Sequence, residues 1–164
     1  MKEWTRYVDD TFAFIKPNKE KEIQEVLNGF HEKIKFTYEK EEKRKIAFLD
    51  VSLSRNDDGN LETKVYRKAT NTDIYMNWHS HAPLTWKIST LRCLIKRAFM
   101  ISSNDKYLQE ELTHLKKVFT EYNEYPMKTV EEVIRDETEK QESNNEVENQ
   151  DEEKQENEGE TVRR

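Results

Sequence analysis

Apolar side chains become rare beyond about residue 135 of this 164-residue chain, so a hydrophobic core can form only from the residues before that boundary. From Asp136 to the end, Val147 and Val162 are the only strongly apolar residues, and 12 acidic side chains accompany 4 basic ones. All 17 aromatic residues, with a net charge of +2, lie in residues 1–135. This small apolar surface cannot offset the entropy lost on folding. The composition therefore predicts a disordered acidic tail over residues 136–164.

The same distribution excludes several protein classes. The longest stretch without a charged side chain, Ile74–Trp86, is rich in Asn, His, Ser and Thr, so no membrane partner is expected. The first residues lack the apolar segment of a secretory signal. The single cysteine, Cys93, excludes an internal disulfide, and we expect it to be a small buried residue. We therefore predict an intracellular protein, nuclear or cytoplasmic, that is not secreted and uses no small-molecule cofactor.

Alternating apolar and polar residues predict strands in the first part of the chain. Residues 6–15 indicate two short strands around a turn at Asp9-Asp10. The segment Asn56–Asn60 has the chemistry of a hairpin turn. The other predicted strands are 34–39, 46–54 and 61–67.

One amphipathic helix is predicted between these strands, over residues 19–33. Its apolar residues form a single stripe on a charged surface, so the helix should lie on a sheet. Asn18 precedes it and is a suitable N-cap.

Beyond Asp73 the apolar period becomes helical. Apolar residues step by three and four over 84–98 and again over 108–122, which predicts two amphipathic helices. The polar residues 102–104 can cap the second helix, so the two form a helix-turn-helix-like pair. The pair Thr129–Glu132 suggests a capping box for a last helix. The order of elements predicts an α+β fold.

The string Arg6-Tyr7-Val8-Asp9-Asp10-Thr11-Phe12 carries the clearest chemistry. Two adjacent carboxylates at a tight turn concentrate negative charge, and Mg²⁺ binds a few carboxylates together with water and phosphate oxygens. Such carboxylates serve two-metal phosphoryl transfer. Asp-Asp is also ordinary turn chemistry, so the string by itself leaves both interpretations open.

This string resembles the Y-x-D-D catalytic hairpin of reverse transcriptases. Other segments, in the same order along the chain, are similar to the Penelope-like retroelement group. They are Ile34–Thr37, Phe48–Val51, Val65–Asp73, Asn77–Leu84 and the helices that follow.

The resemblance implies a partial polymerase palm with the primer-grip region over residues 1–72, built from antiparallel hairpins and one helix. Residues 73–135 would be the helical thumb, which contains the helix-turn-helix-like pair. Asp9 and Asp10 would be the catalytic carboxylates and Mg²⁺ ligands, with Asp9 the direct ligand. The partner would be an RNA or DNA template–primer.

Part of the family's active site has no counterpart here. Only eight residues precede Asp9, which leaves no room for an earlier palm carboxylate or for the fingers. We therefore expect a truncated RNA-directed DNA polymerase fragment that is inactive alone, and whether it is an enzyme stays open. The strand over residues 6–8 would lack its usual neighbour, and an exposed strand edge favours self-association.

The alternative function is a non-catalytic nucleic-acid-binding helix-turn-helix module. Residues 60–120 carry ten basic and five acidic side chains. Lys and Arg clusters neutralise phosphates and aromatic rings stack on bases, although a solvated helix face has a similar charge pattern. The acidic tail could compete for the same basic face. The predicted nucleic-acid contacts in this stretch are Arg67, Lys68, Lys87, Arg92, Lys96 and Arg97. The resemblance to reverse transcriptases adds Tyr7, which would pack near the primer terminus, and Phe48 in the primer-grip region.

Overall fold

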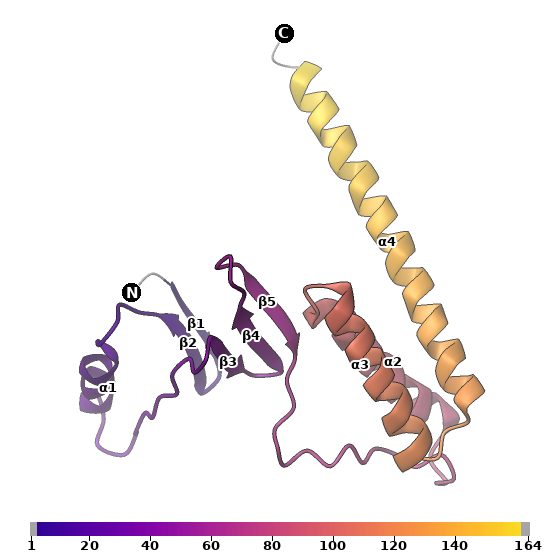
Figure 1. The fold of residues 1–164 in the computed structure, drawn as a ribbon, viewed down its shortest axis with the longest axis horizontal. Coiled ribbons are helices and arrows are strands. Elements are labelled where there is room, and N and C mark those ends of the chain that lie inside the picture. Colours follow the sequence, from indigo (N-terminus) through magenta and orange to yellow (C-terminus); the bar gives the residue numbers. More distant parts are fainter. Residues whose placement is uncertain (1–2, 162–164) are drawn as a thin grey trace. The chain divides into compact units, whose positions relative to one another are not determined.

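The computed structural model describes residues 3–161, with side chains described as far as Asn144 (Figure 1). The described residues form two small antiparallel sheets and four α-helices, which confirms the predicted α+β class. The chain divides into two compact units, Met1–Arg67 and Lys68–Arg164. No helix in the described part of the chain is both long and apolar enough to span a membrane.

The first sheet of unit 1 is a hairpin of β1 (Glu3–Tyr7) and β2 (Asp10–Phe14). Tyr7 pairs with Asp10, and Val8 and Asp9 form the two-residue turn. Val8 takes a φ of 53°, the left-handed conformation that tight hairpin turns use. The hairpin is confirmed, but its turn begins one residue earlier than predicted, so Asp10 opens the second strand.

Helix α1 (Glu20–Gly29) is confirmed but is shorter than predicted, and two expectations about it are wrong. Asn18 lies at a φ of 63°, and the residue before the helix is Lys19, with no side-chain cap. No residue of α1 is buried, so the helix does not bury its stripe on a sheet.

The predicted strand over residues 34–39 is also wrong, and α1 supplies the reason. Asn28 accepts a hydrogen bond from the Phe36 main-chain nitrogen at 2.6 Å and donates to the Phe36 carbonyl at 3.3 Å. Gln24 donates to the same carbonyl at 2.8 Å. These helix amides therefore take the backbone groups of Phe36 that a strand partner would bind, and the segment stays a loop.

The second sheet has the order β3 (Lys45–Phe48), β4 (Val51–Arg55), β5 (Leu61–Val65), with both pairs antiparallel. The single strand predicted over residues 46–54 is wrong. A turn at Leu49 and Asp50 divides it, with Leu49 at a φ of 53°. No glycine marks this turn, which explains why the sequence pattern did not reveal it.

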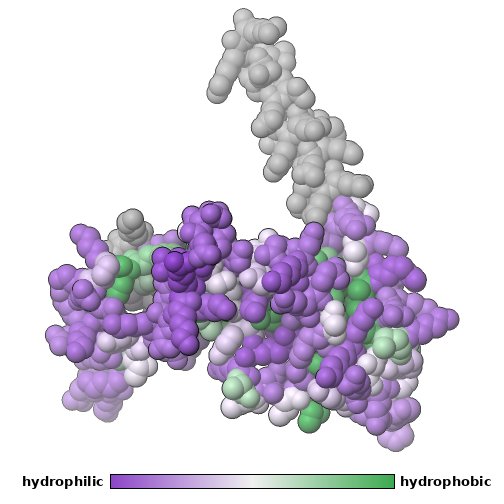
Figure 2. Space-filling model, viewed as in Figure 1, coloured by the Kyte–Doolittle hydropathy of each residue, from purple (hydrophilic) through white to green (hydrophobic). Residues whose placement is uncertain are grey.

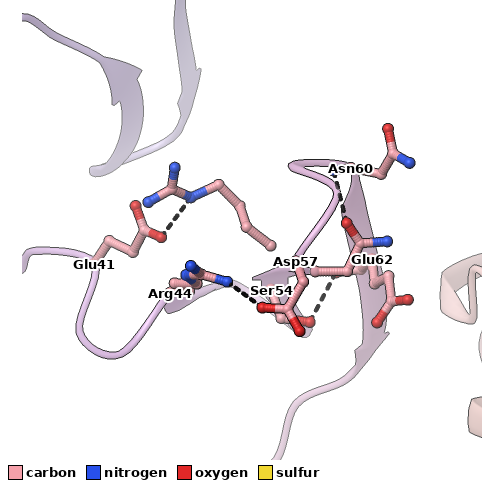
Figure 3. Close-up of polar contacts among 8 residues, drawn as sticks. Glu41, Arg44, Ser54, Asp57, Asn60 and Glu62 are labelled. Carbon is pink, nitrogen blue, oxygen red and sulfur yellow. Dashed lines mark hydrogen bonds and ion pairs between the residues drawn. The ribbon is translucent and has the colours of Figure 1, made fainter.

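The hairpin turn over Asn56–Asn60 is confirmed (Figure 3). Asn56 Oδ1 accepts from the Asn60 main-chain nitrogen at 2.9 Å, and Gly59 has a φ of 85°. Two ion pairs brace this sheet, Arg55–Glu41 at 2.7 Å and Arg44–Asp57 at 2.6 Å. Both pairs are solvent-exposed, so each contributes at most about 1 kcal/mol.

Unit 1 has a small apolar interior. Among its described residues, Val65 is the one buried apolar side chain. The Phe12 ring lies 5.2 Å from Phe14 and 5.5 Å from Phe48, which joins the two sheets through aromatic contacts. The surface in Figure 2 is accordingly hydrophilic with scattered apolar patches.

Unit 2 contains the main core, built by α2 (Leu84–Ile101), α3 (Asp105–Lys117), the π-helical segment η1 (Val118–Tyr122) and α4 (Met127–Thr161). Both predicted amphipathic helices are confirmed. Asn104 caps α3 by accepting from the Tyr107 main-chain nitrogen at 3.0 Å. The buried cluster consists of Leu91, Leu94, Ile95, Ala98, Leu112, Leu115, Val118, Phe119, Tyr125, Val130 and Val133.

Helix α4 differs from expectation at both ends. It begins at Met127, so Thr129 lies inside the helix, and the predicted capping box is wrong. Residues 136–161, for which composition predicts disorder, continue the helix in the structure. Their Glu, Gln and Lys content favours helix, and Arg135–Glu139 is an i, i+4 pair at 3.9 Å. Residues 162–164 of the acidic segment lie outside the described residues.

Candidate nucleic-acid interface

The β1–β2 hairpin brings the predicted carboxylates together at its tip. Asp9 lies in the turn and Asp10 begins β2, and both side chains are exposed. Tyr7, the cross-strand neighbour of Asp10, is exposed as well. Among the described side chains, residues 3–144, no cluster of three or more His, Cys, Asp or Glu residues could hold a metal ion. The two carboxylates are donors of the type Mg²⁺ uses, but the set is incomplete, so no chemical step follows from it.

Phe48, Arg67 and Lys68 are the other predicted contacts that precede α2. Phe48 ends β3 and packs on Phe12, with a half-buried ring. Arg67 ends unit 1 and Lys68 begins unit 2.

In unit 2, Asn123 fastens the segment that leads into α2. Its side chain is 1% exposed, and Nδ2 donates to the carbonyls of Asp73 at 3.0 Å and Val118 at 2.9 Å. Oδ1 accepts from the Tyr75 main-chain nitrogen at 2.7 Å, and the Asn123 carbonyl accepts from Trp78 at 2.9 Å. Asn123 directly follows the π-helical segment η1. No sequence pattern predicts a π-helical turn at this position.

Lys87 is a predicted nucleic-acid contact, but in the structure its side chain binds main-chain carbonyl groups of the same chain. Its residue is buried, and Nζ donates to the carbonyls of Trp78 at 2.6 Å and Ser80 at 2.7 Å. The ammonium group also lies 5.7 Å from the centre of the Trp78 ring. In this structure Lys87 fixes the entry into α2, and its ammonium group faces the protein interior.

The positive charge of the helix-turn-helix-like pair lies on the first helix. Helix α2 contains four basic and no acidic residues, whereas α3 contains three of each. An exposed stripe runs along α2 with steps of three and four residues. It consists of Trp86, Ser89, Cys93, Lys96 and Met100.

Cys93 is exposed on this stripe, so its predicted burial is wrong. The apolar residues Leu91 and Leu94 on either side of Cys93 are buried in the core. The helical turn places Cys93 on the opposite face from them.

Two of the predicted contacts on α2 share one carboxylate of α4. Arg92 Nε lies 3.3 Å from Glu137 Oε1, and Lys96 Nζ lies 3.7 Å from Glu137 Oε2. Lys140 donates to Glu137 Oε1 at 2.9 Å, and Asp136 lies 3.9 Å from Arg92. The Glu137 side chain is 3% exposed. The contact therefore joins a buried anion to cations on the rim of the core.

The electrostatics favour an ionised Glu137. Burial by itself raises the pKa of this carboxyl group. The Lys140 hydrogen bond and the charges of Lys140, Lys96 and Arg92 outweigh burial, so the pKa lies below its ordinary value.

Glu137 is not among the residues predicted from the sequence to take part in the site. The available signal is its position, because it continues the helical spacing of the buried residues Val130 and Val133. A carboxylate on an apolar stripe is buried with the stripe, and a buried carboxylate requires cationic or hydrogen-bonding partners.

Comparison with known proteins supports the helical part of this description. Residues 74–135 match the animal helix-turn-helix domain family, over α2, α3, η1 and the first turns of α4. No curated protein and no solved structure matches the chain. This segment is therefore similar to a helix-turn-helix domain, as the periodicity of the two helices predicts.

Proposed function

We propose that unit 2 is a nucleic-acid-binding helix-turn-helix module that contacts phosphates mainly through α2. The supporting observation is that α2 carries four basic and no acidic residues while lying within the matched segment 74–135. Backbone phosphates are neutralised by such Lys and Arg groups, and these contacts position a protein without reading the sequence.

The second helix argues against base readout. In helix-turn-helix proteins the second helix enters the major groove with its N-terminal residues against base edges. On α3 these positions include exposed Asp105 and Glu110 beside Lys106, so acidic groups would approach the strongly negative groove. We therefore propose binding that depends little on sequence and strongly on salt.

The salt dependence follows from the number of phosphates contacted. Arg92, Lys96 and Arg97 are the α2 cations other than the buried Lys87. Three contacts give a slope of log K against log salt of about −2.7, or about 40-fold weaker binding between 50 and 200 mM salt.

Fluorescence anisotropy with a labelled 30-base-pair DNA duplex tests this function on the full chain. Lys96→Gln is expected to reduce the salt slope by about one. Lys128→Gln is the matched control, because this exposed lysine lies on α4 and pairs only with Glu132 among the contacts observed. Absence of binding at 50 mM salt, or binding that salt leaves unchanged, would refute the proposal.

The reverse-transcriptase resemblance provides a second candidate, in which unit 1 is part of a palm and unit 2 the thumb of a Penelope-like polymerase. The observation that favours it is the β1–β2 hairpin, which holds Asp9 and Asp10 at its tip. Primer extension with Mg²⁺ tests it, and we expect none from this chain alone. Extension that Asp9→Asn abolishes would instead make the chain an active polymerase.

Self-association belongs to this second candidate. All five residues of β1 are exposed, and its paired neighbour within the described residues is β2 alone. An open edge of this type can pair with a strand of another copy. Sedimentation velocity at increasing concentration is expected to show a dimer, and a monomer at all concentrations would contradict it.

A further inference from the structure

Helix α4 places an acidic group where the proposed module would bind a phosphate. We propose that α4 masks the α2 cations, so that nucleic acid must displace the Glu137 carboxylate from Arg92 and Lys96. This inference rests on the proposed nucleic-acid-binding function and adds an autoinhibitory contact within the same unit.

The geometry of the contact resembles that of a bound phosphate. Arg92 and Lys96 are four residues apart on α2, so their side chains lie on one face of the helix. Each faces a different oxygen of Glu137, at 3.3 Å and 3.7 Å. Two cations bridged by two oxygens of one anion is the arrangement a backbone phosphate would also satisfy.

The cations remain accessible while the anion does not. The side chain of Lys96 is 63% exposed and that of Arg92 is 42% exposed, compared with 3% for Glu137. Arg92 Nε is buried and forms no hydrogen bond, so its contact with Glu137 is an ion pair without hydrogen-bond geometry. A phosphate at the exposed parts of the Arg92 and Lys96 side chains would therefore compete with ion pairs and not with hydrogen bonds.

The position of Glu137 in α4 makes local displacement feasible. Val130 and Val133 anchor the first turns of α4 in the core. Glu137 is the last buried residue among the side chains described as far as Asn144. Ile134 is partly buried against the same core, so the described contacts of α4 with α2 beyond Ile134 are the ion pairs of Asp136 and Glu137. This part of α4 can move away while the apolar contacts of Val130, Val133 and Ile134 remain.

The acidic character of the chain beyond this point strengthens the mask. Among residues 136–144, the part of this segment whose side chains the structure describes, four side chains are acidic and one is basic. A nucleic acid that approaches Arg92 and Lys96 meets the other three of these acidic groups as well as Glu137, and repulsion between like charges weakens as salt rises. Masking should thus lower affinity most at low salt, where phosphate contacts are otherwise strongest.

The test compares two full-length variants that remove the same charge from the same helix. Glu137→Gln removes the anion that Arg92 and Lys96 share and leaves Arg92 with Asp136 at 3.9 Å, whereas Glu142→Gln alters an exposed residue five positions further along α4. Binding to the 30-base-pair duplex at 50 mM salt is expected to tighten about 3- to 10-fold in Glu137→Gln, with a salt slope steeper by about one. Glu142→Gln should change affinity less than about twofold, by the long-range effect of one charge.

The outcomes separate this inference from the function on which it rests. If the wild-type chain binds with the proposed salt dependence and the two variants do not differ, the module stands and the mask is refuted. If no variant binds at low salt, the function fails and the mask fails with it.

Hydrogen exchange provides a second measurement that needs no substitution. In the wild-type chain, duplex DNA is expected to accelerate amide exchange in residues 135–144, because α4 loses its contact with α2. Unchanged or slower exchange in that segment on binding would overturn the proposal even if Glu137→Gln disturbed folding.

Discussion

Replacement of Asn123 by alanine is expected to lower the free energy of unfolding of unit 2 by more than the same replacement of a solvent-exposed asparagine. The substitution deletes three side-chain hydrogen bonds of 2.7 to 3.0 Å from a residue that is 1% exposed. It leaves the Tyr75 N–H and the carbonyls of Asp73 and Val118 without that partner. Each net hydrogen bond contributes about 1 kcal/mol, so the expected loss is about 3 kcal/mol.

The corresponding fall in melting temperature is large for a unit of this size. One kcal/mol shifts the midpoint of a 60–100-residue domain by roughly 4–8 °C, so Asn123→Ala should lower Tm by about 12–24 °C. Far-UV circular dichroism is the suitable assay, because α2, α3 and α4 all lie in unit 2. Asn144→Ala, at an exposed position of α4, is the matched control and should stay within about 0.5 kcal/mol.

Asn123→Asp tests the hydrogen bonds that the Asn123 amide donates separately from the one that it accepts. Asn123→Asp preserves the acceptor for the Tyr75 N–H but places an oxygen against the carbonyls of Asp73 and Val118. It should be at least as destabilising as alanine, since an uncompensated buried charge is costly. A loss below about 1 kcal/mol for both variants would refute the idea that Asn123 fastens the α2 entry segment.

Three further predictions concern single residues of unit 2. Lys87→Met should cost about 2 kcal/mol in urea unfolding, because two main-chain carbonyls lose a charged donor, and an unchanged midpoint would contradict this structural position. Asn104→Ala should cost about 1 kcal/mol through the lost N-cap, and an equal loss from Asn104→Asp would argue against it, since aspartate still caps. The folded-state pKa of Glu137 is lowered, so its ion pairs stabilise the fold above the unfolded pKa of about 4.3 and lose this effect as pH falls through the folded value. Melting temperatures between pH 3 and 7 should therefore depend less on pH in Glu137→Gln, and parallel curves would contradict the assignment.

Local patterns predicted the elements whose signals are contained in a few neighbouring residues. The steps of three and four over residues 84–98 and 108–122 predicted the two helices, and the structure identifies Asn104 as the cap among the three polar residues 102–104. The turn at Asn56–Asn60 and the β1–β2 hairpin followed from turn chemistry and alternation. The predicted strand over residues 34–39 failed because Asn28 and Gln24 on α1 bind the Phe36 backbone, which alternation within the strand cannot reveal.

The features of the candidate site also fall into those predicted from local sequence and those that depend on packing. The sequence by itself determined that α2 would be a basic amphipathic helix and that residues beyond 135 would be acidic, because charge and period are properties of the chain. Only the tertiary structure decided which cations face solvent. It buried Lys87 against two carbonyls, exposed Cys93, and set Glu137 between Arg92 and Lys96. The physical reason is that burial and ion pairing depend on which helix faces pack together, and residues more than 40 positions apart come into contact only when the helices pack.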